Sequence, residues 1–82
     1  MLELPWDALR TFATCCQMGS FTSAARALGI GQATVSRHIA TLEDDIGQVL
    51  FDRHRDGLTL TSAAQTLLPH AEAMAAQAHA AG

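Results

Sequence analysis

The residues best suited to chemistry lie in the stretch GIGQATVSRHIA, residues 29–40. Two glycines two residues apart, followed by hydroxyls and an arginine, could form a loop that holds the phosphates of a nucleotide. A dinucleotide-binding fingerprint, however, requires a third glycine where Thr34 stands and a strand before the loop, whereas residues 20–28 favour a helix. A Walker loop requires a lysine, and the chain has none. The stretch therefore predicts a tight turn between two helices rather than a nucleotide loop.

The other reactive side chains form no catalytic or metal-binding set. Cys15 and Cys16 are adjacent, so a disulfide between them would close a strained ring, and the chain has no CxxC spacing. We expect two reduced thiols on a helix, with Cys16 in the core. The histidines are scattered and share no ligand spacing: His38, His54, His70 and His79. The sequence predicts no enzyme activity, no metal and no cofactor.

Length and composition indicate one small folded domain. The chain has 82 residues, of which 49% are hydrophobic and 16% charged. It lacks both the basic start of a signal peptide and an apolar run of about 18 residues, which a membrane helix needs. We therefore expect a cytoplasmic protein with no membrane partner.

The distribution of charge matters more here than its sum. The formal net charge is −3, which argues against nucleic acid as a partner. Residues 8–42, however, contain no acidic residue and carry Arg10, Arg26 and Arg37. An anion could contact this segment through arginines, hydroxyls and helix N-termini.

Helical periodicity and capping residues predict the first two helices. The first opens at Pro5 and ends at Gly19, and its predicted core face consists of Trp6, Leu9, Phe12, Ala13 and Cys16. Ser20 is expected to cap the second helix. Gly29 is expected to end it in the left-handed conformation.

A third helix is predicted from about Gln32 to Gly47. Its apolar stripe recurs at spacings of 4, 3 and 4 residues: Val35, Ile39, Leu42 and Ile46. Ile30, between the two glycines, is expected to insert into the core. The arc of the third helix opposite the stripe carries small and polar residues: Ala33, Ser36, Arg37 and Ala40, flanked by Thr34 and Thr41.

A hairpin and a fourth helix are predicted after residue 48. Asp56-Gly57 is a hairpin turn signal between two short strands, with Arg53 and Arg55 near the tip. Thr61 should cap the fourth helix. One side of this helix carries a seam of small and apolar residues, which predicts pairing with a second copy of the chain. The residues of the seam are Ala64, Leu67, Leu68, Ala71, Met74, Ala75 and Ala78. The pattern persists beyond Pro69, which favours one long kinked helix over a helix that stops at Leu68.

A helix, a tight turn and a helix with an acid-free outer face have the geometry that places a helix in the major groove of DNA. Small side chains allow close approach, and Gln32 and Thr34 offer donors and acceptors for base edges. Arg37 can reach guanine or a phosphate. The hydroxyls of Thr22 and Ser23, with Ser20, suit a phosphate.

The sequence FTSAARALGIGQATVSRHIATLEDDIGQVLFDRHRDGLTLT resembles the N-terminal DNA-binding domain of LysR-type transcriptional regulators. The resemblance implies a mainly α fold: a winged helix-turn-helix of three helices and a two-stranded β-hairpin wing, followed by a long linker helix that forms a homodimer. It implies residues 1–60 as the winged helix-turn-helix and 61–82 as the linker helix. The family's effector-binding domain, through which members bind a small molecule and form tetramers, is absent from these 82 residues.

The resemblance also implies individual contacts. The recognition-helix contacts are Gln32, Thr34, Ser36 and Arg37, with Ala33 facing the bases where the family often has proline. Thr22 matches a phosphate contact, and Arg53 and Arg55 match contacts from the wing. Gly31 stands where serine is usual and predicts a weakened helix cap. Ala64 stands where glycine is common.

We expect sequence-specific binding to a promoter inverted repeat of double-stranded DNA, as a bacterial transcription regulator. The alternative is a winged-helix protein-interaction module without specific DNA binding, which the acidic net charge and the alanine-rich seam would suit. Replacing Arg37 by alanine distinguishes the two, because it should damage DNA binding and leave dimerisation intact.

Overall fold

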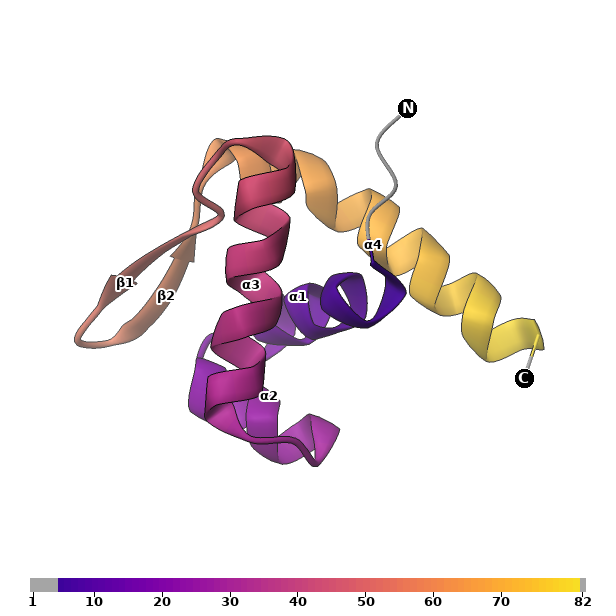
Figure 1. Ribbon diagram of the computed structural model, residues 1–82, viewed down its shortest axis with the longest axis horizontal. Coiled ribbons are helices and arrows are strands. Elements are labelled where there is room, and N and C mark those ends of the chain that lie inside the picture. The colour runs from indigo at the N-terminus through magenta and orange to yellow at the C-terminus, as the bar shows by residue number, and fades with distance from the viewer. Residues whose placement is uncertain (1–4, 82) are drawn as a thin grey trace.

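The structure, a computed structural model, describes residues 5–81, with side chains described from 5 to 74. Its elements, in order, are α1 (Trp6–Met18), α2 (Phe21–Leu28), α3 (Gln32–Ile46), β1 (Phe51–His54), β2 (Gly57–Leu60) and α4 (Ser62–Ala81). The hairpin projects from one side of the three-helix body, and α4 extends to the other (Figure 1). These elements confirm a mainly α winged helix-turn-helix followed by a further helix.

The local signals for helix ends are confirmed. The Ser23 amide donates to Ser20 Oγ at 3.0 Å, which caps α2. The Ala64 amide donates to Thr61 Oγ1 at 3.3 Å, which caps α4. Gly29 follows α2 with a φ of +70°. These caps satisfy backbone groups that a helix leaves unpaired at its ends.

The core is built around α1, which packs against α2, α3 and α4. Phe12, Val35, Leu42 and Leu50 are fully buried. Two expectations for α1 are wrong: Trp6 is 42% exposed, and Cys15 rather than Cys16 is the fully buried thiol. Three helices surround α1, so its buried face is broader than the stripe predicted from spacing, while Trp6 is the first residue of the helix.

The hairpin is attached to the body by backbone and aromatic contacts. The Phe51 ring lies 5.5 Å from the Phe12 ring and 5.9 Å from the Phe21 ring, measured between centroids. The Leu58 amide donates to the Gly19 carbonyl at 3.1 Å. This bond ties β2 to the turn between α1 and α2.

Gly57 is the first residue of β2 and pairs with His54, so the two-residue turn is Arg55-Asp56, one residue earlier than the predicted turn signal. Gly57 has a φ of +132°, and a Cβ there would lie 2.7 Å from the Gly19 carbonyl oxygen. The position therefore needs glycine for close approach as well as for its backbone conformation. Arg53 lies within β1 opposite Leu58, and Arg55 is in the turn.

The final helix continues through Pro69, as the persistent pattern favoured. Proline removes the hydrogen bond to the carbonyl of Gln65, but both residues are exposed, so water can take the place of that bond. Ala64 and Ala71 are 0% and 1% exposed because they pack in this chain's own core. They are therefore removed from the predicted partner-facing seam. The side chains of Ala75 and Ala78 lie outside the described residues.

Replacing Gly57 by alanine should lower the free energy of unfolding by about 1–3 kcal/mol, because the new Cβ meets the Gly19 carbonyl and alanine resists this backbone conformation. Gly31→Ala is the matched control, since Gly31 has a φ of −73° and open space around it. Urea denaturation followed by circular dichroism measures both. Equal stability of the two variants would contradict the packing described for the hairpin.

Candidate nucleic-acid interface

The turn between α2 and α3 sets the direction of α3. The Ile30 amide donates to the Ala25 carbonyl at 3.0 Å, and the Gly31 carbonyl accepts from the amides of Thr34 and Val35. Ile30 is partly buried and packs against the core, as expected. Gly31 is the N-cap of α3 and makes no side-chain cap bond, which confirms the weakened cap. The turn is therefore held by its backbone and by Ile30.

The α3 helix has a buried face and an exposed face. Val35, Ile39 and Leu42 are buried in the core. Gln32, Ala33 and Arg37 are exposed, and Thr34 and Ser36 are half-buried at the edges of the outer arc. The five side chains predicted to face a ligand thus share one side of α3, towards its N-terminal end.

A bond between α1 and α3 adds to this arrangement. The Thr11 hydroxyl and His38 Nδ1 are hydrogen-bonded at 2.7 Å, and Thr11 is only 1% exposed. The sequence offered no signal for this pair, because its members are 27 residues apart on two helices. The bond joins α3 to α1 at His38, the residue that follows Arg37.

Two pairs of polar side chains on the outer face are already hydrogen-bonded. The Thr22 hydroxyl on α2 donates to Gln32 Oε1 at 3.2 Å. On α3, Arg37 Nη2 donates to Thr34 Oγ1 at 3.1 Å. These bonds restrict side chains that would otherwise move freely in water.

The hairpin forms one side of an open hollow beside these residues. Its volume is about 180 Å³, and it is lined by Ser20, Phe21, Thr22, Gln32, Arg53, His54, Gly57 and Leu58. The Arg53 guanidinium lies over the Phe21 ring, 4.5 Å from its centroid. The structure thus brings Thr22, Gln32 and Arg53 to one hollow. Ser23 is exposed nearby on α2, and Arg55 lies in the hairpin turn.

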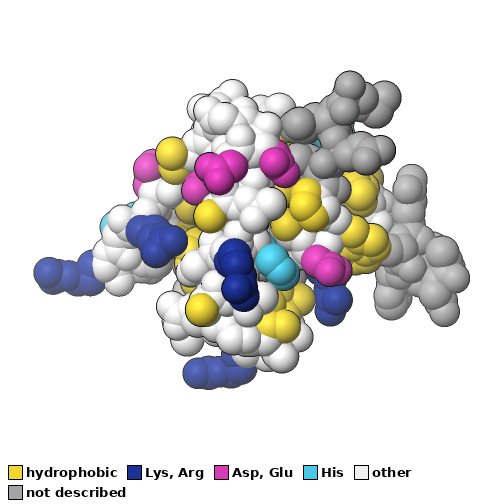
Figure 2. All heavy atoms as spheres, in the orientation of Figure 1, with side chains coloured by type: hydrophobic (Ala, Val, Ile, Leu, Met, Phe, Trp, Pro, Cys, Tyr) yellow, Lys and Arg dark blue, Asp and Glu magenta, His cyan; other side chains and the backbone are white. Residues whose placement is uncertain are grey.

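The charged side chains are partly segregated. Figure 2 shows arginine side chains over the hairpin and the lower half of the molecule, while most of the acidic side chains visible in this view cross the upper half. The hairpin also carries two exposed aspartates beside its arginines. The C-terminal end of α3 carries Glu43, Asp44 and Asp45. Glu43 has a local role, since its Oε2 accepts the Leu50 amide at 2.8 Å. The end of α3 nearest the hollow is therefore its acid-free end.

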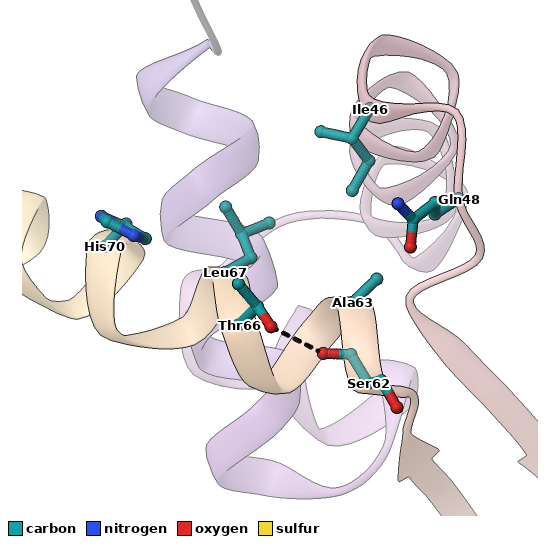
Figure 3. Close-up of a pocket in the computed structure, with 7 residues that line it drawn as sticks. All are labelled: Ile46, Gln48, Ser62, Ala63, Thr66, Leu67 and His70. Atoms are coloured by element: carbon teal, nitrogen blue, oxygen red, sulfur yellow. Dashed lines mark hydrogen bonds between the residues drawn. The ribbon is translucent and has the colours of Figure 1, made fainter.

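A second hollow lies where α3 ends and α4 begins. Figure 3 shows this groove of about 330 Å³ lined by Ile46, Gln48, Ser62, Ala63, Thr66, Leu67 and His70. Its lining includes the apolar side chains of Ile46, Ala63 and Leu67, and the Thr66 hydroxyl donates to the Ser62 carbonyl at 3.1 Å. None of the predicted base-contacting residues lines it.

The described residues hold no group of three or more side chains that could bind a metal ion. Burial raises the pKa of the Cys15 and Cys16 thiols to about 12; the charge of Cys16 adds to the shift at Cys15, and that of Glu72 to the shift at Cys16. These thiols are poor nucleophiles at neutral pH. No helix in the described part of the chain has the length and apolar character to cross a membrane.

Comparison with known proteins gives a consistent result. A family model described as "Bacterial regulatory helix-turn-helix protein, lysR family" matches residues 6–65. The transcriptional activator AmpR of Rhodobacter capsulatus is 45% identical over 67 residues, which cover 82% of this chain and 23% of AmpR. The protein PtxE of Stutzerimonas stutzeri is 45% identical over 74 residues, covering 90% of this chain and 37% of PtxE. This chain therefore spans well under half of either relative.

Solved structures agree with these matches. OxyR of Corynebacterium glutamicum, as its C206S mutant, superposes with a TM-score of 0.91 at 31% identity, covering 95% of this chain and 24% of OxyR. The DNA-binding domain of CbnR, solved in complex with DNA, superposes with a TM-score of 0.86 at 29% identity, covering 95% of this chain and 90% of that domain.

The thiols should react slowly in the folded chain. At pH 8 a pKa of about 12 leaves far less thiolate than the ordinary value of 9.0, and the thiolate is the reactive form. We expect alkylation by iodoacetamide to be at least about a hundredfold slower than in the urea-unfolded chain, as measured by mass spectrometry. Similar rates in the two states would show that the thiols are not protected by burial.

Proposed function

The chain belongs to the LysR family of bacterial regulatory helix-turn-helix proteins, and we propose that it regulates transcription by binding a specific double-stranded DNA sequence as a homodimer. Residues 1–60 are the proposed DNA-binding unit and residues 61–82 the linker that pairs two copies. An effector-binding domain and tetramer formation are proposed for a longer protein of which this chain would be the N-terminal part. A regulator of bacterial DNA would act in the cytoplasm.

The main support is that the acid-free N-terminal half of α3 lies beside an open hollow that an arginine of the hairpin also lines. A helix of this kind fits the major groove, where base edges present hydrogen-bonding groups. The hairpin would then lie along the adjacent DNA backbone. The CbnR DNA-binding domain, which has the same fold, was solved in complex with DNA.

The proposed base contacts come from α3. Gln32 and Thr34 would meet base edges, and the small side chains of Ala33 and Ser36 would permit close approach, with Ala33 able to meet a thymine methyl group. Arg37 is exposed and would reach guanine or a phosphate. Its bond to Thr34 holds the guanidinium over the same face before DNA arrives.

The proposed phosphate contacts surround the hollow. The free amides at the start of α2 and the hydroxyl of Ser23 would bind one phosphate. Arg53 and Arg55 would neutralise phosphates beside the groove. Thr22 lines the same hollow.

Dimerisation is proposed through the outer face of α4. Met74 is 41% exposed, and Leu67 and Leu68 are partly buried, so apolar surface is available for a second copy. Leu67 also lines the groove shown in Figure 3, whose apolar side chains would extend the proposed contact. Two domains related by a two-fold axis would place their α3 helices in successive major grooves.

The proposal is tested by enriching duplexes from a random pool and measuring their binding at several salt concentrations. The affinity should fall steeply as salt rises, because phosphate contacts release counterions. Arg37→Ala should weaken binding by about tenfold, whereas Arg10→Ala, which removes the same charge from α1, should change it by less than about twofold. A wild-type chain that enriches no sequence, or equal losses in the two variants, would contradict the proposed interface.

Met74→Lys should weaken self-association by about tenfold, because it places a charge in an apolar contact. Gln65→Lys is the control: nine residues separate the two positions, about two and a half helical turns, so Gln65 lies on the opposite side of α4. Analytical ultracentrifugation of both variants measures the effect. A wild-type chain that stays monomeric at every concentration would contradict dimerisation through α4.

A further inference from the structure

The hydroxyl of Thr22 already donates a hydrogen bond within the chain, without any DNA bound. It donates to Gln32 Oε1 at 3.2 Å, across the turn that joins α2 to α3. A threonine hydroxyl has one proton to donate, and phosphate oxygens only accept. Thr22 therefore cannot keep its bond to Gln32 and also donate to a phosphate.

The start of α2 has other groups for a phosphate. Ser20 Oγ accepts the Ser23 amide, so the Ser20 hydroxyl keeps its own proton for another acceptor. Ser23 is exposed, and Arg53 lines the same hollow as Thr22. A phosphate at this position would not require the proton of Thr22.

Gln32, in contrast, needs support from a neighbour. It is the first residue of α3 and follows Gly31, which provides no side-chain cap. Its side chain is exposed, and a free glutamine loses considerable rotamer entropy when it binds a base. A bond that holds the amide in one orientation reduces this loss.

We propose that Thr22 is a positioning residue, which holds Gln32 so that its Nε2 amide group faces the DNA and thereby sets the base preference at the base pair that Gln32 meets. The inference rests on the proposed DNA-binding function and assigns Thr22 a role different from phosphate binding. With Oε1 turned to Thr22, the Nε2 group is the free donor. Its partners in the major groove are acceptors: purine N7, guanine O6 or thymine O4.

The first test needs no DNA. Thr22→Val preserves the shape of the side chain and removes the proton, and Thr22→Ser retains the proton; Thr22 is exposed, so both are accommodated. In the free wild-type chain, ¹⁵N relaxation of the Gln32 side-chain amide should give a higher order parameter than that of exposed Gln17. The value should fall to that of Gln17 in Thr22→Val and be retained in Thr22→Ser. An unchanged value in Thr22→Val would overturn the proposal.

The second test measures base preference. The probe is a duplex enriched by the wild-type chain from a random pool, varied at the base pair whose preference is lost in Gln32→Ala. Wild type should discriminate the best from the worst pair by about tenfold, and Thr22→Val by less than about threefold, with the salt dependence unchanged. Thr22→Ser should match wild type.

The outcomes distinguish a failure of the positioning role from a failure of the proposed function. Equal weakening of Thr22→Val on all four base pairs would identify a phosphate contact and overturn the positioning role. A wild-type chain that enriches no sequence would overturn the proposed function itself. Full base preference in Thr22→Val would overturn only the role of Thr22.

Discussion

The close approach of the hairpin to the turn between α1 and α2 is the constraint on which the interface depends. Gly57 can reach the Gly19 carbonyl only without a side chain, and the Leu58 amide is then bonded to that carbonyl. Phe51, packed on Phe12 and Phe21, holds the base of the hairpin in the core. Together they place Arg53 against Phe21 and in the same hollow as Gln32, so the hairpin and α3 form one continuous surface. A hairpin without this contact would leave Arg53 free to move away from α3.

The two proposed tasks, DNA binding and dimerisation, fall to different parts of the molecule. The hairpin lies on one side of the three-helix body, and α4 extends to the other side (Figure 1). The acidic residues that give the net charge of −3 are concentrated outside residues 8–42. A chain with five arginines and no lysine has few charges with which to attract DNA nonspecifically. The affinity of the chain for DNA would therefore depend on well-positioned contacts. The bonds that restrain Gln32 and Arg37 are important for this reason.

Much of the fold was predictable because its signals are local. Ser20 and Thr61 cap helices within three residues, Gly29 ends α2, and the apolar pattern continues through Pro69. The wrong or missing predictions concern contacts between residues that are far apart in the sequence. Spacing along α1 could not show that three helices surround it, so Cys16 and Trp6 were wrongly predicted to be its core residues. The Thr11–His38 bond joins residues 27 positions apart in the sequence, and the Thr22–Gln32 bond joins residues 10 positions apart. No local sequence pattern predicts either bond. The exposed face of α3 and the hairpin beside it were predictable, whereas the bonds that restrain their side chains were not.

In the proposed function, one surface receives the DNA: the starts of α2 and α3 together with the hairpin. Its most direct test is an NMR titration of the ¹⁵N-labelled chain with a duplex enriched from a random pool. We expect the largest amide shift changes in residues 20–23, 32–37 and 53–55 and only small changes in the described part of α4. Largest changes along α4, or at the acidic end of α3, would contradict it.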